Sequence, residues 1–231
     1  MAVFAIADFH LPGRSEKPMD IFGDHWQNHF EKISRLWQQM IAPQDVVLIA
    51  GDISWAMQLE DALPDLQAIA ALNGQKVLVR GNHDYWWSSL KKIRACLPDG
   101  LYVLQNDAIK LGDYVICGTR GWNLPDAEQS GSEEQKIYQR ELLRLELSLK
   151  AAQKLGGAQF AMLHFPPLAG DGLSTGFTEL LERYQVPHVI YGHLHGAGIS
   201  GAFQGEKNGV TYHLTSCDAL HFCPVKICDT L

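Results

Sequence analysis

The chain has 231 residues, enough for one large domain or two small ones with a sizeable buried core. Hydrophobic residues make up 46% and charged residues 19%, which is typical of a globular protein and excludes a disordered one. The formal net charge of −7 disfavours unassisted binding to a nucleic-acid backbone, but it is compatible with a small anionic substrate if metal ions supply positive charge.

The N-terminal stretch MAVFAIADFH has no basic region of the kind that opens a signal peptide, and its apolar run stops at Asp8. No other stretch approaches the length needed to cross a membrane. The five cysteines form no C-x-x-C pair, so we interpret them as reduced thiols. The sequence therefore predicts a cytoplasmic protein without membrane contact.

Short apolar runs rich in Val, Ile, Leu and Ala recur along the chain. Their length and their lack of alternation with polar residues are typical of strands buried on both faces. The predicted strands are residues 2–7, 45–50, 76–79, 114–118, 159–164, 188–192 and 210–216.

Apolar residues recur with helical spacing in residues 24–41 and 133–155. Asp24 is the predicted N-cap of the first helix. Ser132 and Gln135 form a predicted capping box before the second. We expect both apolar stripes to pack on a sheet, with a face between subunits as the alternative.

The early alternation of strand and helix predicts an α/β protein. No internal repeat, low-complexity tract or linker-like composition marks a boundary, so we expect residues 1–231 to form a single domain. The longest predicted loops are residues 11–23, 119–132 and 165–175.

Five of the predicted strands end in side chains that can bind a metal. In an open α/β sheet, functional groups gather outside the carboxyl ends of the strands. A lone histidine or a Gly-Asp pair usually has a structural role, but turn chemistry does not require five such endings at once. The endings are Asp8 with His10, Gly51-Asp52, Gly81-Asn82-His83-Asp84, His164, and His193 with His195.

These endings, in this order, resemble the motifs of the calcineurin-like metallophosphoesterases: D-x-H, G-D, G-N-H-[DE], a lone His and G-H-x-H. They span residues 8 to 195. The resemblance implies a four-layer α/β/β/α sandwich of two mixed β-sheets, with a dinuclear metal site at the carboxyl ends of the strands. The longer stretches GDISWA, GNHDYWWSSL, GTRGWN and YGHLHG are similar to a bacterial branch of predicted phosphohydrolases, which indicates no substrate.

Carried over position by position, the resemblance implies a complete ligand set. It assigns Asp8, His10 and His195 to one metal, Asn82, His164 and His193 to the other, and Asp52 as the bridge between them. Nitrogen and oxygen donors without a thiolate suit Mn²⁺, our first expectation, or Fe²⁺ or Zn²⁺. Two such ions roughly 3.5–4 Å apart lower the pKa of a bridging water and clamp the oxygens of a displacement at phosphorus.

Other polar and aromatic residues near these motifs have expected roles. His83 is the predicted general acid that protonates the leaving oxygen, and Asp84 is predicted to orient it. Arg120 is a candidate to bind a substrate phosphate through two hydrogen bonds, with a structural ion pair as the alternative. Trp86 and Trp87 either stack on a base or pack in the core.

Two departures narrow the resemblance. Purple acid phosphatases have a ligating Tyr three residues after the bridging Asp, where this chain has Trp55, so ferric-tyrosinate chemistry is not expected. Protein Ser/Thr phosphatases carry G-D-x-x-D-R-G and G-N-H-E, where this chain has GDISWAM and GNHD, so phosphoprotein substrates are disfavoured.

The sequence thus predicts a phosphoesterase that cleaves a small diester or monoester with a two-metal-activated hydroxide, the diester slightly favoured. The rim loops carry Arg14, Lys17 and Arg120, and we expect them to form a shallow, open cleft. Neither a nucleic-acid polymer nor a membrane is an expected partner. The alternative function is a non-catalytic scaffold that binds protein partners, against which the intact ligand set argues.

Overall fold

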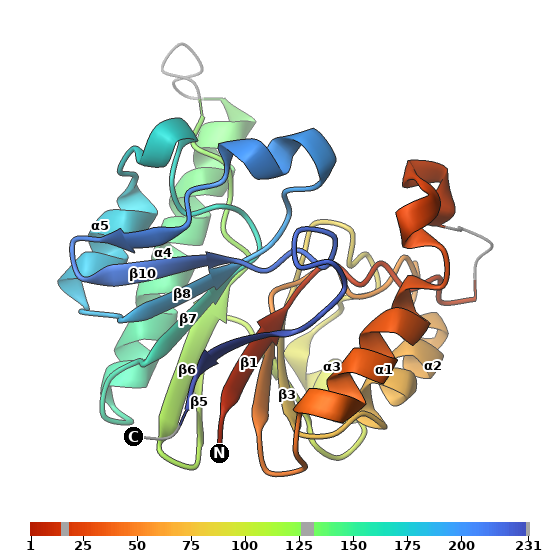
Figure 1. Ribbon diagram of the computed structural model, residues 1–231. Helices are drawn as coiled ribbons and strands as arrows, with labels where there is room; N and C mark the ends of the chain where they lie inside the picture. The colour runs from red at the N-terminus through yellow and green to blue at the C-terminus, as the bar shows by residue number, and fades with distance from the viewer. Residues whose placement is uncertain (15–18, 126–131, 230–231) are drawn as a thin grey trace. The chain divides into compact units, whose positions relative to one another are not determined.

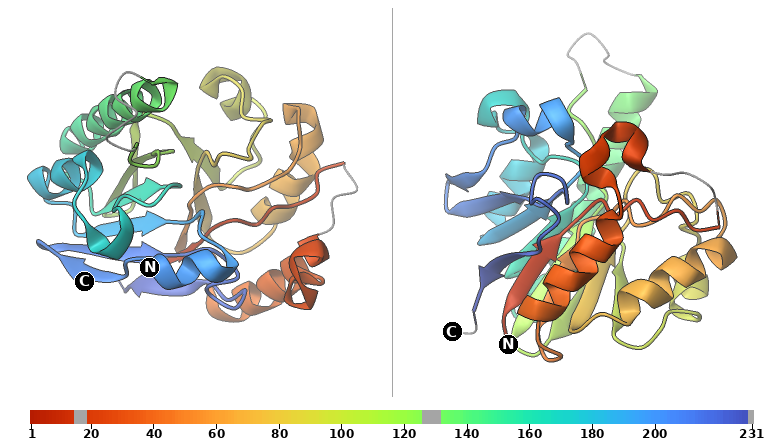
Figure 2. Two further views of the ribbon diagram at one scale, coloured as in Figure 1. Left: turned by 90° about the horizontal axis from the view of Figure 1, so that it is seen from above. Right: turned by 45° about the vertical axis from the view of Figure 1, so that its right-hand side comes forward.

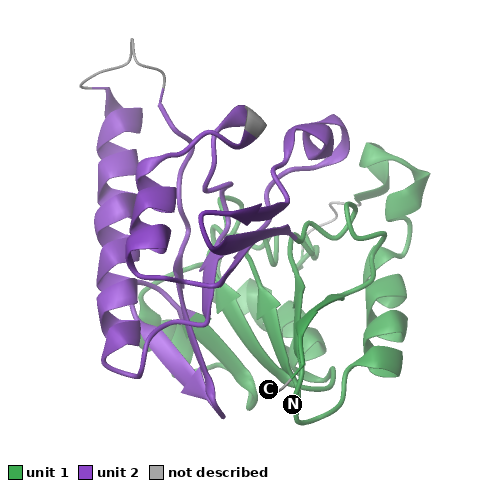
Figure 3. Cartoon of the chain, turned by 60° about the vertical axis from the view of Figure 1, so that its left-hand side comes forward, with its two compact units in different colours: residues 1–103, 215–231 green, residues 104–214 purple. Residues whose placement is uncertain are grey.

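The computed structural model describes residues 1–14, 19–125 and 132–229. The chain divides into two compact units, shown in two colours in Figure 3. Unit 1 comprises residues 1–103 and 215–231, and unit 2 comprises residues 104–214. The assignment of residues 1–231 to a single domain stays a prediction.

Unit 1 is built on a mixed sheet with the strand order β11-β1-β2-β3-β4 (Figure 1). Strands β1, β2 and β3 are parallel to one another, and β11 pairs antiparallel with β1. The carboxyl ends of β1, β2 and β3 therefore lie at one edge of this sheet. The strands are β1 (Val3–Ile6), β2 (Val46–Ile49), β3 (Gln75–Val79), β4 (Leu101–Leu104) and β11 (Val225–Cys228).

The helices of unit 1 are α1 (His29–Met40), α2 (Leu59–Ala70) and α3 (Leu90–Arg94), with two 3-10 turns, η1 (Met19–Phe22) and η2 (Asp24–Trp26), before α1. Helices α1 and α2 run alongside the sheet (Figure 2). Their apolar side chains, among them Trp37 and Leu66, join the strand residues in one buried cluster. The predicted packing of the first helical stripe on a sheet is confirmed.

Trp86 and Trp87 belong to the same core cluster, with exposed fractions of 1% and 6%. Of the two roles expected for this pair, core packing is confirmed. Neither ring has a face available for stacking on a base.

The start of α1 differs from the prediction. Asp24 begins the turn η2 and does not cap a helix, and α1 begins at His29 after Asn28, whose φ of 51° is left-handed. Hydrophobic spacing continues through the break, which explains why the pattern predicted one helix over 24–41. By contrast, Ser132 caps α4 (Glu133–Gln153) as predicted, because its side chain accepts a hydrogen bond from the N–H of Gln135.

Unit 2 contains the second mixed sheet, with the strand order β5-β6-β7-β8-β10-β9. Its four inner strands are parallel, and both outer strands pair antiparallel with their neighbours. The strands are β5 (Ala108–Leu111), β6 (Tyr114–Thr119), β7 (Phe160–Leu163), β8 (His188–Tyr191), β9 (Gly205–Lys207) and β10 (Val210–Leu214).

Helix α4 packs against β5, β6 and the shorter helix α5 (Gly176–Arg183). Two 3-10 turns, η4 (Gly170–Gly172) and η5 (Gly196–Gly201), lie in the loops that follow β7 and β8. Both loops begin at the carboxyl ends of parallel strands, where the sequence predicts the functional groups.

The predicted α/β class, with two mixed sheets flanked by helices, is confirmed. Every predicted strand is present, as β1, β2, β3, β6, β7, β8 and β10. The strands β4, β5, β9 and β11 were not predicted. Among the residues that the structure describes, every helix is too short or too polar to cross a membrane.

Candidate metal centre

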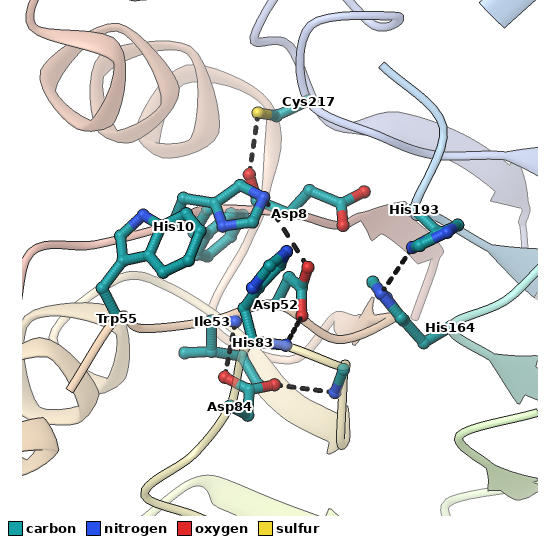
Figure 4. Close-up of polar contacts among 12 residues, drawn as sticks. Asp8, His10, Asp52, Ile53, Trp55, His83, Asp84, His164, His193 and Cys217 are labelled. Atoms are coloured by element: carbon teal, nitrogen blue, oxygen red, sulfur yellow. Dashed lines mark hydrogen bonds and ion pairs between the residues drawn. The ribbon is translucent and has the colours of Figure 1, made fainter. Parts of the chain in front are cut away.

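In unit 1, the segment after β1 continues beside the segment after β2. The backbone N–H of Asp8 donates to the carbonyl of Gly51, and that of His10 donates to the carbonyl of Asp52, at 3.0 and 2.9 Å. The pairing thus extends past the formal ends of the two strands. It explains why a D-x-H motif and a G-D motif on neighbouring parallel strands present their side chains together (Figure 4).

Asp8 and Asp52, the two carboxylates that follow β1 and β2 in unit 1, form a buried pair of like charge. Asp8 is 0% exposed, Asp52 is 2% exposed, and an oxygen of each lies within 4.8 Å of the other. At this spacing the repulsion between two carboxylates is roughly 3 kcal/mol for an effective dielectric constant of about 20. A bound cation removes that repulsion, so the donor chemistry of unit 1 fits a metal ion.

His10 completes this group. Its ring nitrogen Nε2 lies 3.7 Å from an Asp52 oxygen, and its side chain also presents a ligand atom within 4.8 Å of Asp8. Imidazole nitrogen together with two carboxylates is a donor set for Mn²⁺, Fe²⁺ or Zn²⁺.

Gly81, the first residue of GNHD, lies directly against Asp52. A Cβ atom at position 81 would stand 2.0 Å from the Asp52 Oδ1 atom and 2.2 Å from its backbone nitrogen. The glycine is required because the loop after β3 must approach the Asp52 backbone this closely. Asn82 follows it, and the backbone N–H of His83 donates to Asp52 Oδ1 at 2.8 Å.

Trp55 packs against two imidazoles of unit 1, those of His10 and His83. Its ring stacks on His10 at a centroid distance of 4.9 Å and lies 4.4 Å from the ring of His83. The sequence singled out this position only for the tyrosine it lacks. Its packing role could not be found there, because a tryptophan three residues after an aspartate carries no signal for the rings it contacts.

Asp84 is fully buried and is surrounded by hydrogen-bond donors. Its carboxylate accepts hydrogen bonds from the backbone N–H groups of Gly81, Ile53 and Ser54 and from the indole of Trp86, at 2.7 to 3.2 Å. Burial raises its pKa, and these four donors oppose that shift. Asp84 therefore ties the loop after β3 to the loop after β2, and its role in orienting His83 stays a prediction.

In unit 2, His164 and His193 lie side by side. His164 is fully buried at the end of β7, and its Nε2 atom lies 3.3 Å from Nδ1 of His193. Two imidazoles that each bind one ion at about 2.1 Å stand about 3.0–3.4 Å apart, so this spacing fits a shared metal. Phe165 packs on the His193 ring at a centroid distance of 4.3 Å.

His195 is the third candidate ligand of unit 2. It is partly exposed and stands directly before the turn η5, where the chain returns to an extended conformation. His193, by contrast, has a left-handed backbone.

Arg120 forms the ion pair that the sequence offered as the alternative to phosphate binding. Its guanidinium lies 3.5 Å from the fully buried carboxylate of Glu141 and 4.5 Å from the centre of the Trp122 ring. Glu141 also accepts hydrogen bonds from Thr119 and Gly121. The carbonyl of Arg120 accepts the N–H of His164 at 2.9 Å, which fixes the backbone of this candidate ligand to the residue that follows β6.

Of the other basic residues predicted at the rim, Arg14 lies near Asp61, with 3.5 Å between the charged atoms. Lys17 lies outside the described residues.

Several candidate ligands have a left-handed backbone. The φ angles of Asp8, His10, Asp52 and His193 are 63°, 47°, 52° and 73°. Side chains larger than glycine rarely adopt this conformation, and such residues concentrate at functional sites. Four of the seven candidate ligands have this conformation, which also occurs at six other non-glycine residues among those that the structure describes.

Comparison with known protein families agrees with this site. The family model described as calcineurin-like phosphoesterase matches residues 1–197, which include every candidate ligand. A search of curated proteins finds no match.

Solved structures share the fold at low sequence identity. A protein from Thermus thermophilus is 13% identical with a TM-score of 0.56, over 84% of this chain and 81% of its own. The phosphopantetheinyl hydrolase of Mycobacterium tuberculosis is 16% identical with a TM-score of 0.51, over 91% and 87%. A protein of unknown function from Aquifex aeolicus is 15% identical with a TM-score of 0.50, over 97% and 95%.

The substitution Gly81→Ala tests the contact between GNHD and Asp52. We expect the added methyl group to displace the Asp52 carboxylate and to weaken Mn²⁺ binding at least tenfold, measured by isothermal titration. Gly201→Ala is the matched control, because a Cβ atom there meets open space and the backbone is not left-handed. Unchanged Mn²⁺ affinity in a folded Gly81→Ala protein would contradict the role of this contact.

The substitution Asp84→Asn tests the link between the two loops. It replaces one acceptor oxygen by an NH₂ group that faces N–H donors, so we expect the free energy of unfolding to fall by about 1–3 kcal/mol. Denaturant unfolding measures this change. Equal stability of Asp84→Asn and the wild type would refute the link.

Proposed function

The chain belongs to the calcineurin-like phosphoesterase family, and from this premise we propose that it hydrolyses a small phosphoester, diesters ahead of monoesters. Members of this family are metal-dependent phosphoester hydrolases that bind two divalent metal ions. The observation that carries the proposal is the buried pair Asp8 and Asp52 with His10 beside it, a donor set that fits a divalent cation.

The proposed ligands follow the family pattern. Asp8, His10 and His195 hold one ion, Asn82, His164 and His193 hold the other, and Asp52 serves both. When bound, the ions supply Lewis-acid activation of water and neutralise charge on the phosphoryl oxygens. Mn²⁺ is the proposed metal, with Fe²⁺ and Zn²⁺ as the alternatives.

His83 is the proposed general acid. Its backbone N–H is bound to Asp52, and Trp55 packs on its ring, so the imidazole is held beside a metal ligand. The protonated imidazole gives its N–H proton to the ester oxygen as the bond to phosphorus breaks, and the product leaves as a neutral alcohol. Asp84 supports this step by holding the backbone of Gly81, two residues before His83, against the loop after β2.

The preference for diesters is supported by the pairing of Arg120. A monoester dianion carries more negative charge than a diester monoanion and needs more cationic groups around it. Glu141 already neutralises part of the Arg120 charge. The guanidinium has five N–H donors, so we propose that it also orients one phosphoryl oxygen of the substrate.

Parallel assays of the Mn²⁺-loaded protein on bis-p-nitrophenyl phosphate and p-nitrophenyl phosphate test the function. We expect measurable release of nitrophenolate from both, with the larger kcat/KM for the diester, and loss of activity with a chelator. A higher kcat/KM for the monoester would contradict the diester preference. No release from either ester, at full metal occupancy, would favour the non-catalytic scaffold.

The substitution His83→Ala tests the general acid. We expect kcat to fall by about two to four orders of magnitude while Mn²⁺ affinity stays within a factor of a few, because the imidazole acts on the leaving group. His25→Ala, which removes an exposed imidazole of η2, is the control and should leave kcat unchanged. Loss of metal with full turnover per remaining metal pair would show His83 to be a ligand instead.

A further inference from the structure

Unit 2 contains a hollow of about 300 Å³ that the metal centre does not account for. This volume is at the lower end of the range of small-molecule pockets, about 300–1,000 Å³. Aromatic and aliphatic side chains form much of its wall, and none of the described residues that line it is charged. The members used below are Trp122, Leu168, Phe177, Leu194 and Phe203.

The hollow adjoins the histidines of unit 2 through the chain itself. Leu194 stands between His193 and His195, and Leu168 lies four residues after His164. Ring contacts also connect the hollow to these histidines. The ring centroids of Trp122 and Phe165 are 4.8 Å apart, and those of Phe165 and His193 are 4.3 Å apart. Leu194 thus lines the hollow directly between two proposed ligands in the chain, and the ring of Phe165 links the hollow-lining Trp122 to the proposed ligand His193.

The Trp122 wall is held in place from three sides. The indole N–H donates to Glu134 at 2.5 Å, the Arg120 guanidinium lies 4.5 Å from the ring, and Phe165 packs against it. An aromatic ring fixed in this way provides a flat surface at low entropic cost.

Phe203, another aromatic residue that lines the hollow, is also fixed in place. Its carbonyl accepts the hydroxyl of Tyr191 at 2.5 Å, and its ring lies so close to Gly172 that a Cβ atom there would stand 2.7 Å away. Lys207 donates to the carbonyl of Gly172 and secures the loop that carries it. Both aromatic side chains are therefore held in place without a ligand.

We propose that this hollow binds an uncharged aromatic substituent of the phosphoester, the group attached through an ester oxygen that is not cleaved. This inference rests on the proposed function and specifies its substrate class: diesters in which one substituent is a flat apolar ring. An uncharged wall favours such a ring over a charged or strongly hydrated group, because the latter would lose water without gaining a partner. The hollow adds depth and selectivity to the shallow rim that the sequence predicts.

Two diesters with the same leaving group test the proposal: phenyl 4-nitrophenyl phosphate and methyl 4-nitrophenyl phosphate. The ratio of their kcat/KM values, phenyl over methyl, is measured for each protein. Comparing ratios between variants cancels the intrinsic reactivity of the two esters. For the wild type we expect a ratio of about ten or more, because the ring is buried and the methyl group is not.

Gly198 also lines the hollow, and the substitution Gly198→Leu is designed to fill part of it. A Cβ atom at this position meets the Leu194 side chain at an ordinary contact distance of 3.8 Å, and the backbone is not left-handed. We expect the ratio to fall about tenfold while the methyl ester is cleaved as by the wild type. Ser200→Leu, an exposed position in the same turn η5 that does not line the hollow, is the matched control and should keep the wild-type ratio.

A binding measurement separates this inference from the proposed function. Isothermal titration of the Mn²⁺-loaded protein with the slowly cleaved esters diphenyl phosphate and dimethyl phosphate should give about tenfold tighter binding of the diphenyl ester, and Gly198→Leu should remove the difference. If no ester is hydrolysed but this difference is found, the hydrolase proposal fails and the pocket stands. Equal binding of the two esters, or an equal effect of Gly198→Leu and Ser200→Leu, would overturn the pocket.

Discussion

The buried carboxylate of Asp84 is the constraint on which the unit 1 half of the site depends. It lies between two loops that follow neighbouring strands, and it accepts N–H groups from both. A buried carboxylate without such donors would be strongly unfavourable, and the N–H groups without it would also lack partners. The carboxylate and the N–H groups therefore depend on each other. Because they join the loop after β2 to the loop after β3, they also fix the positions of Asp52 and His83 in those loops.

Aromatic side chains perform the same task in each unit. Trp55 packs on His10 and His83, and Phe165 packs on His164 and His193. An imidazole beside a fixed ring has few accessible rotamers, so a metal or substrate that binds it orders little that is not already ordered. The neighbouring aromatic rings therefore fix the orientation of these histidine side chains in the absence of a ligand.

The sequence predicted the buried strands, which are continuous apolar runs, and the polar residues that directly follow them. Parallel strands such as β2 are buried on both faces and read as apolar runs, and the candidate ligands follow them directly. Edge strands such as β9 and β11 have exposed positions and no such run, so they were missed. The role of Asp84 depends on Ile53 and Ser54, about thirty residues away, and only folding brings these together. From the sequence, the only partner predicted for Asp84 was its neighbour His83.

The left-handed backbone of four candidate ligands lowers the stability of the fold at the positions where the proposed function needs a side chain. Holding a side chain larger than glycine in this conformation costs on the order of 1 kcal/mol or more, somewhat less for aspartate. Glycine at position 8, 10, 52 or 193 would relieve that strain and remove a ligand at the same time. Backbone relaxation and the proposed metal binding therefore place opposite demands on these four positions: glycine relieves the strain, and only the larger side chain can bind an ion.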